Sequence, residues 1–207
     1  MKRIYLVRHG ESEWNLLKKI QGQQDISLTA NGIKQANLIG NRLINEKIDK
    51  IYSSDLIRAY KTAEIIGNKL NLDVIQMVEF REIHFGIWEG ISNEEIEEKH
   101  KDNQILWRKE PEKLEIEGAE TLKELQKRAL SGINKIIDNE ENENIDNILI
   151  VSHSATLKAI ILGLLGINLT NFKNLTINNV SLSIIEIREY NRVLKLFNDT
   201  CHIKERQ

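Results

Sequence analysis

The stretch IYLVRHGESEWN (residues 4–15) begins with four apolar residues and then runs into a cation and a titratable ring, Arg8 and His9. An apolar run of this length is typical of a strand that is buried on both faces of a central sheet. Packing does not explain an arginine and a histidine at the end of such a strand, because both side chains are costly to bury without a partner. This stretch therefore predicts a site for an anion directly after the first strand.

A second apolar run with the same ending occurs late in the chain, where NILIVS (147–152) leads to His153 and then to an apolar helical segment at 154–166. Further strands are predicted at 48–53, 73–78, 181–189 and 193–199, and helices at 29–46, 55–70, 121–138 and for about two turns after Ser92. Residues 101–120 are predicted to be irregular and 139–147 to be an exposed loop. Alternating strands and helices predict a single-domain α/β fold, a mostly parallel central sheet with helices on both faces.

Composition excludes several classes of function. The chain has 207 residues and a net charge of −2, so it has no overall basic field for nucleic acid or a membrane surface. Its longest apolar stretch, 159–166, is too short to span a bilayer, and no signal peptide is predicted. The single cysteine, Cys201, makes neither an internal disulfide nor a zinc cluster, which favours a reducing, cytoplasmic location.

Five polar side chains follow predicted strands, and ligands of α/β sheets bind beyond the carboxyl ends of strands. They are Arg8, His9, Arg58, Glu82 and His153. Arginine matches phosphate oxygens, and a histidine acts as a nucleophile toward phosphorus. A second histidine stabilises charge on the transferring group, and a carboxylic acid protonates the leaving alkoxide and then activates water. Together they predict phosphoryl transfer without a metal ion or cofactor, because the arginines supply the positive charge.

Five segments of the chain, taken in order, resemble the histidine phosphatase superfamily, which has the phosphoglycerate mutase-like fold. They are LVRHGESEWN (6–15), QGQQDISLTANGIKQA (21–36), IYSSDLIRAYKTAEII (51–66), FREIHFGIWEG (80–90) and VSHSATLKAI (151–160). The resemblance covers most of the chain and implies one histidine phosphatase domain over residues 1–207, with a lid insertion at about 84–120.

The resemblance also implies a role for each matched residue. His9 matches the nucleophile, Glu82 matches the proton donor, and Arg8, Arg58 and His153 match the rest of the phosphate pocket.

Four further positions are implied to bind substrate. Asn15 matches a polar residue that touches the phosphoryl group, and Gln21 with Gly22 matches the segment that approaches substrate. Ser154 stands where glycine is common, and either caps the following helix or adds a hydroxyl near the phosphate. His84 neighbours the proton donor in sequence, and its role is left open.

Within the superfamily, the residues favour a phosphomonoesterase over a cofactor-dependent phosphoglycerate mutase. The stretch LLKKIQGQQD (16–25) is unlike a mutase, and the tail after the last predicted strand is short. The resemblance is strongest to the small bacterial phosphatases, which include α-ribazole phosphatases, phosphoserine phosphatases and broad-specificity enzymes. A small phosphomonoester is therefore the expected partner, and the oligomeric state is left open. A non-catalytic member that only binds a phospholigand is the remote alternative.

Aromatic and aliphatic residues gather in the implied lid. They are Phe85, Trp88, Leu106 and Trp107, and they either line an apolar substrate pocket or pack the inserted segment.

Overall fold

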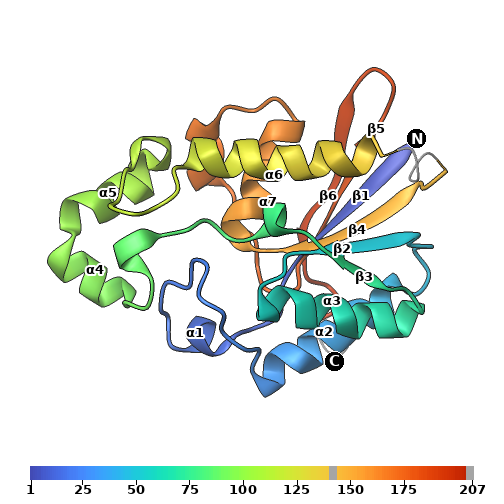
Figure 1. Cartoon of the computed structure of the whole chain (residues 1–207), viewed down its shortest axis with the longest axis horizontal. Coiled ribbons are helices and arrows are strands. Elements are labelled where there is room, and N and C mark those ends of the chain that lie inside the picture. The colour runs from blue at the N-terminus through green and yellow to red at the C-terminus, as the bar shows by residue number, and fades with distance from the viewer. Residues whose placement is uncertain (140–143, 204–207) are drawn as a thin grey trace.

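A six-stranded sheet in the order β3-β2-β4-β1-β5-β6 forms the centre of the molecule (Figure 1). The computed structural model describes residues 1–139 and 144–203. The strands are β1 (Lys2–Arg8), β2 (Lys50–Ser53), β3 (Val74–Gln76), β4 (Asn147–Ser152), β5 (Leu182–Ile187) and β6 (Arg192–Asp199). From β3 to β1 all neighbours are parallel, whereas β5 and β6 are antiparallel additions at one edge. The predicted mostly parallel α/β sheet is therefore confirmed.

Helices cover both faces of this sheet. α2 (Ala30–Leu43) and α3 (Ile57–Leu70) lie on one face, and α6 (Leu122–Ile137) and α7 (Ser154–Leu164) on the other (Figure 1). Successive side chains of β1 point to opposite faces of the sheet, because side chains alternate along a strand. Ile4 and Leu6 join the apolar cluster under α6 and α7, whereas Tyr5 and Val7 join the cluster under α2 and α3. β1 is thus buried on both sides and gives His9 a rigid base.

The capping signals in the sequence mark helix starts correctly. The hydroxyl of Thr29 accepts from the Gly32 N–H at the start of α2. Both predicted capping boxes are present, one at Ser92 before α4 (Asn93–Lys99) and one at Thr121 before α6. One short helix, α1 (Glu13–Leu16), lies in the loop after β1 and has its own capping box at Ser12.

The prediction that residues 101–120 are irregular is wrong for its first half, because α5 (Lys101–Lys109) is a helix. The helix begins directly after α4, and the residue between the two, His100, makes no side-chain cap hydrogen bond. No capping residue therefore marked its start in the sequence. Tertiary packing supports the helix instead, since Leu106 and Trp107 lie against an apolar cluster formed with distant residues.

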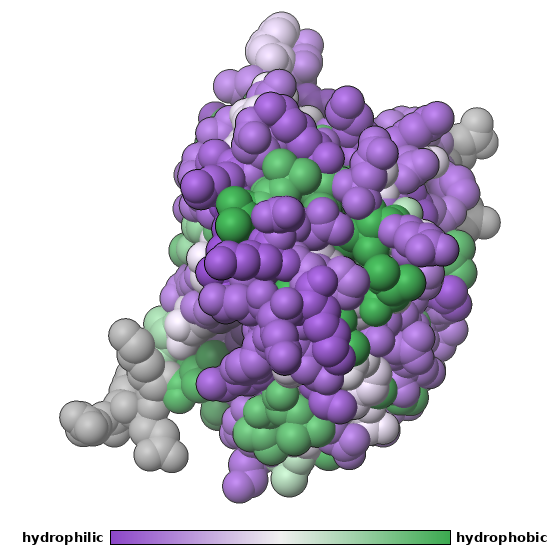
Figure 2. Space-filling model, turned by 90° about the vertical axis from the view of Figure 1, so that its left-hand side faces the viewer, coloured by the Kyte–Doolittle hydropathy of each residue, from purple (hydrophilic) through white to green (hydrophobic). Residues whose placement is uncertain are grey.

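That cluster joins the segment 84–120 to the rest of the protein. The segment contains η2 (Gly86–Trp88), α4, α5 and η3 (Pro111–Lys113), and its apolar side chains pack against α6, α7 and η5 (Leu169–Asn174). Another short turn, η1 (Val78–Phe80), precedes it. Figure 2 views the molecule from the side of α4 and α5, where hydrophilic residues cover most of the surface and hydrophobic residues form separate areas.

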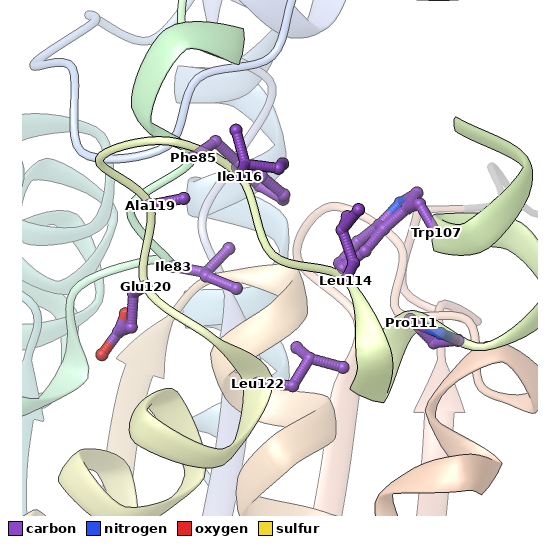
Figure 3. A pocket seen from close by; sticks show the side chains of 9 residues that line it. All are labelled: Ile83, Phe85, Trp107, Pro111, Leu114, Ile116, Ala119, Glu120 and Leu122. Carbon is purple, nitrogen blue, oxygen red and sulfur yellow. The ribbon is translucent and has the colours of Figure 1, made fainter. Parts of the chain in front are cut away.

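The apolar hollow inside this segment is too small to hold a substrate. Phe85, Trp107, Pro111 and Leu114 point toward it, together with side chains of neighbouring elements (Figure 3). Its volume is about 10 Å³, which is about the room that one water molecule needs. Trp88 is 1% exposed and lies wholly in the core. These aromatic side chains therefore pack the segment 84–120, the second of the two roles considered for them.

Two further observations concern the chain as a whole. Among the described residues, every helix is too short or too polar to cross a lipid bilayer. The predicted exposed loop at 139–147 includes residues 140–143, which lie outside the described part of the chain.

Candidate active site

The two histidines that follow buried strands lie side by side. β1 and β4 are parallel neighbours in which Arg8 pairs with Ser152, so the two strands end side by side at the same edge of the sheet. The His9 N–H donates to the Ser152 carbonyl at 3.0 Å, and the rings of His9 and His153 have centroids 5.1 Å apart. The exposed fractions of the two residues are 2% and 0%. Residues separated by most of the chain therefore share one buried site.

His9 is neutral and has a defined tautomer. Its Nδ1–H donates to the Gly10 carbonyl at 2.6 Å, and because a carbonyl only accepts, the proton lies on Nδ1 and the lone pair on Nε2. Burial, with the nearby charges of Arg58 and Arg8, holds the pKa of His9 well below its usual value of 6.5. The ring therefore presents a free Nε2 at neutral pH, as a nucleophile requires.

His153 is held through its other nitrogen. It occupies the N-cap position of α7, and its Nε2 forms a hydrogen bond with the Ser54 hydroxyl at 2.9 Å. Its Nδ1 is buried and has no hydrogen-bond partner among the described residues. Burial first, and then the charge of Arg58, lowers the pKa of His153 well below 6.5. His153 therefore offers Nδ1 to a ligand while Ser54 holds the ring in place.

Two arginines reach the histidines from different elements, and carbonyl groups hold both. Arg58, in the first turn of α3, is 1% exposed and donates to the carbonyls of Gln24 (2.6 Å) and Gly22 (2.7 Å). Arg8 donates to the Ile177 carbonyl at 2.8 Å. Burial lowers the pKa of Arg58 to about 10, so its guanidinium is charged at neutral pH. The Nε atoms of both arginines are buried and unpartnered within the described chain.

Glu82 lies at the amino end of α7, where the helix dipole favours a negative charge. Its carboxylate accepts from the backbone N–H groups of Ala155 and Thr156, each at 3.2 Å, and from the Thr156 hydroxyl at 3.1 Å. Its negative charge counteracts part of the effect of burial on the pKa of Arg8 and of Arg58. The acid, the second histidine and the arginines are therefore electrostatic neighbours.

The residues expected to bind substrate divide into two groups. Asn15 and Gln21 meet at Ser12, whose backbone N–H donates to Asn15 Oδ1 (3.1 Å) and whose hydroxyl donates to Gln21 Oε1 (2.8 Å). Ser154 is the first residue of α7 and directly follows His153. Gly22 directly follows Gln21, and its carbonyl accepts from Arg58. The structure therefore brings Asn15, Gln21 and Ser154 to the loops around the histidines, and gives Gly22 a supporting contact.

Sequence reasoning missed Glu89, a carboxylate whose side chain is only 5% exposed. It accepts from the backbone N–H of Gln23 (2.9 Å), the side-chain amide of Gln24 (2.8 Å) and the backbone N–H of Phe85 (3.0 Å). Gly22 has φ +50°, and a Cβ there would lie 1.9 Å from Glu89 Oε1. Glu89 thus pins the loop that supplies both carbonyl partners of Arg58.

The open question of His84 has a structural answer. Its Nδ1 lies 2.7 Å from the Gly118 carbonyl, and its Nε2 lies 3.6 Å from Glu89 Oε1. His84, at the start of the segment 84–120, therefore contacts Gly118 near the end of that segment. It also lies close to Glu89, which supports the loop that holds Arg58.

Sequence reasoning also missed Asn179, which precedes β5. Its amide donates to the His9 carbonyl at 2.9 Å and to Asn15 Oδ1 at 3.2 Å. The next residue, Val180, has φ +47°, an unfavourable conformation for a β-branched residue, and its N–H donates to the Arg8 carbonyl at 3.1 Å. Nothing local in the sequence marks these residues, because their partners lie about 170 positions earlier.

The arrangement suits a tetrahedral anion. Three buried nitrogens, Nε of Arg8, Nε of Arg58 and Nδ1 of His153, have no partner in the described chain. An unsatisfied buried polar group costs about 1–3 kcal/mol, so an anion that accepts from them stabilises the site. Within residues 1–139 and 144–203, no three His, Cys, Asp or Glu side chains gather in a way that suits a metal ion.

Comparison with known proteins agrees with this geometry. The family model described as histidine phosphatase superfamily (branch 1) matches residues 4–200. Phosphoserine phosphatase 1 of Hydrogenobacter thermophilus is 37% identical over 205 residues, which cover 99% of this chain and 96% of that protein. A probable phosphoglycerate mutase of Yersinia pestis is 32% identical over 212 residues, with 98% and 95% covered.

Solved structures share the fold as well. A mutant phosphoserine phosphatase from Entamoeba histolytica, in complex with phosphoserine, superposes with a TM-score of 0.85 at 35% identity. The superposition covers 99% of this chain and 100% of that one.

Proposed function

This chain belongs to the histidine phosphatase superfamily, and from that premise we propose that it hydrolyses phosphomonoesters of small metabolites through a phosphohistidine at His9. One observation carries the proposal. A neutral histidine with its Nε2 free lies beside three buried, unpartnered nitrogens of Arg8, Arg58 and His153. A phosphoryl group satisfies these nitrogens with its oxygens and presents its phosphorus to Nε2.

The first step transfers the phosphoryl group to the enzyme. His9 Nε2 attacks phosphorus in line with the ester oxygen, an N–P bond forms, and the P–O bond to the alcohol breaks. The carboxylic acid of Glu82 gives its proton to the departing oxygen. The two arginines and His153 stabilise the equatorial oxygens as charge develops on them.

The second step returns the enzyme to its starting state. The Glu82 carboxylate takes a proton from water, the water oxygen attacks phosphorus, and the P–N bond breaks. Inorganic phosphate leaves, His9 is neutral again, and Glu82 is again the acid. The guanidinium groups of Arg8 and Arg58 carry the positive charge for both steps, so we propose that the reaction needs no metal ion or cofactor.

Hydrolysis is favoured over the mutase reaction, because the relatives named as phosphoserine phosphatases are 37% and 35% identical to this chain, whereas the relative named as a probable phosphoglycerate mutase is 32% identical. We infer phosphoserine or a similarly small phosphomonoester as substrate. We also propose that the segment 84–120 is a lid that sets substrate choice.

The exposed Cys201, which forms no disulfide, supports a reducing, cytoplasmic location.

A competition experiment tests the proposal. The purified full chain is incubated with phosphoserine, with p-nitrophenyl phosphate, and with 3-phosphoglycerate plus its bisphosphate primer, each with and without EDTA. We expect phosphate release that EDTA does not change, and no fast formation of 2-phosphoglycerate. Fast isomerisation would establish the mutase instead. Tight phosphate binding without any turnover would establish a phospholigand-binding member.

A further inference from the structure

The backbone around Glu82 has no regular secondary structure and is held by a side chain of α6. Residues 81–84, which include Glu82, lie between η1 and η2 and belong to neither a helix nor a strand. Backbone carbonyls in such a segment need partners from elsewhere in the protein, because an unpaired buried carbonyl is costly. Arg128, in the second turn of α6, supplies such partners.

The guanidinium of Arg128 binds several carbonyls of this segment at once. Its Nη1 donates to the carbonyls of Glu79 at 2.8 Å and Arg81 at 3.1 Å. Its Nη2 donates to the carbonyl of Glu82 itself at 3.3 Å, and that carbonyl also accepts from the Gln23 side-chain amide at 3.1 Å. A single side chain therefore fixes the backbone both before the acid and at the acid.

A carboxylate fixes the direction of the Arg128 side chain. Glu120 accepts from Nε of Arg128 at 2.8 Å and from Nη2 at 2.7 Å, the two-bond geometry that holds an arginine firmly. The exposed fractions of the Arg128 and Glu120 side chains are 24% and 15%. The backbone N–H of Glu120 donates to the carbonyl of His84, two positions after the acid, at 2.8 Å. Glu120 therefore aims Arg128 at the segment that carries Glu82.

The helix α6 comes close to this segment because a glycine lies one turn after Arg128. Residues four apart share a face of a helix, and a Cβ on Gly132 would lie 2.8 Å from the Cβ of Glu79 and 3.0 Å from the Phe80 ring. On the same side of α6, Lys135 forms an ion pair with Glu79. The contact between α6 and the acid-bearing segment therefore extends along one face of the helix, with Arg128 at the end nearest Glu82.

Two helices thus hold two parts of one residue. α7 binds the carboxylate of Glu82 through the backbone N–H groups of Ala155 and Thr156, and α6 binds its backbone through Arg128. A general acid works only within hydrogen-bond reach of the oxygen that it protonates. Because a misplacement of about 1 Å can cost about 100-fold in rate, the position of this backbone matters for proton transfer.

We propose that Arg128 is a positioning residue for the reaction, which acts through Glu82 and touches no reacting atom. The inference rests on the proposed hydrolysis, in which the carboxylic acid of Glu82 protonates the departing ester oxygen. Arg128 sets the distance between this carboxyl group and the ester oxygen, because it fixes the backbone that carries Glu82. Its loss therefore slows the reactions that depend on protonation of the leaving group and spares the others.

The dependence of the rate on the leaving group tests this inference. Arg128→Met is compared with the wild-type chain by kcat/KM, which reports the transfer to His9, for phosphoserine and for p-nitrophenyl phosphate. We expect a loss of roughly 10- to 100-fold for phosphoserine, and of less than about threefold for p-nitrophenyl phosphate, whose leaving group needs little proton transfer. Inhibition by inorganic phosphate should stay within about twofold of wild type, because the groups that bind the phosphoryl oxygens are unchanged.

A double variant separates positioning from a general loss of structure. In a chain that already carries Glu82→Gln, the added Arg128→Met should lower kcat/KM for phosphoserine by less than about threefold, because the acid through which Arg128 acts is gone. Equal losses on the two esters in Arg128→Met would overturn the inference. So would a full further loss in the double variant.

Two single variants control for folding and for the loss of an ion pair. Glu120→Gln keeps the arginine and weakens its orientation, so it should slow phosphoserine hydrolysis selectively, by a smaller factor than Arg128→Met. If Arg128→Met does not fold, Glu120→Gln carries the test, and an unselective loss in it overturns the inference. Arg42→Met removes a half-buried ion pair with Asp199, from α2 on the other face of the sheet. The ratio of the two kcat/KM values should not change in Arg42→Met, and a changed ratio would also overturn the inference.

The wild-type chain distinguishes failure of this inference from failure of the proposed function. If it hydrolyses neither phosphoserine nor p-nitrophenyl phosphate, the proposed function itself is wrong, and the role of Arg128 falls with it.

Discussion

The ends of β1 and β4 carry the same kind of sequence and differ in how the chain leaves the sheet. At the first strand end, His9 enters a long loop that contains α1 and reaches α2 at Ala30. At the second strand end, His153 caps α7, which begins at the next residue. Both histidines are buried and have pKa values well below 6.5.

The hydrogen bonds give the two rings different chemistry. The Gly10 carbonyl accepts a hydrogen bond from Nδ1–H of His9 and leaves Nε2 free, whereas Ser54 engages Nε2 of His153 and leaves Nδ1 buried and unpartnered. The amino end of α7 also holds the acid Glu82. In the proposed mechanism, the first strand end therefore supplies the attacking atom, and the second supplies charge stabilisation and the proton.

The largest effect is expected from His9→Ala, because it removes the only proposed nucleophile. We expect a loss of more than about 10,000-fold in kcat, even for p-nitrophenyl phosphate, since no other group replaces a covalent nucleophile. The measurement is phosphate release, together with labelling of the protein by ³²P substrate after an alkaline quench, because phosphohistidine is stable in alkali. Wild-type turnover or labelling in this variant would assign the attack to another residue and reverse the roles of the two strand ends.

Glu82→Gln should produce the next largest effect, and the effect should depend on the leaving group. Loss of a general acid costs about 100- to 10,000-fold, so turnover of phosphoserine should fall within that range. Hydrolysis of p-nitrophenyl phosphate, whose leaving group needs little proton transfer, should fall far less. Equal losses for the two substrates would contradict the acid role of the second strand end.

His153→Ala should cost less than His9→Ala and should leave the nucleophile working. Removing one preorganised donor to the transition state lowers kcat by about 100- to 1,000-fold. Unlike His9→Ala, this variant should still form labelled phosphohistidine, only more slowly. If the variant loses labelling altogether, His9 cannot be phosphorylated without His153.

The smallest effect concerns stability, in which the two strand ends should behave alike. Each histidine has a folded-state pKa below its unfolded value of about 6.5. When the pH falls below 6.5, these histidines therefore take up protons in the unfolded chain but stay neutral in the folded chain. The contribution to stability is complete above about pH 6.5 and is lost as the pH falls.

Urea unfolding at pH 7.5 and 5.5, without phosphate, measures this loss. Each of His9→Ala and His153→Ala should reduce the pH dependence of the unfolding free energy by up to about 1.4 kcal/mol per pH unit. An unchanged dependence in either variant would mean that its histidine is charged in the folded protein.

Much of the fold and of the candidate site was predictable, because the signals for it are local. The apolar run of β1, the hydroxyl of Thr29 and the capping box at Ser92 each act within a few residues, and each marks an element that the structure contains. The prediction failed at α5, which has no capping signal and takes its support from packing on distant helices.

The sequence by itself determined which chemical groups are available and roughly where each strand ends, since hydrophobic periodicity and residue type are local properties. Only the tertiary structure decided which nitrogen of His153 is free, because Ser54 lies 99 residues from it. It also decided that Glu89 supports the arginine loop and that Asn179 donates to the His9 carbonyl. These contacts depend on long-range packing, which single residues and their neighbours do not encode.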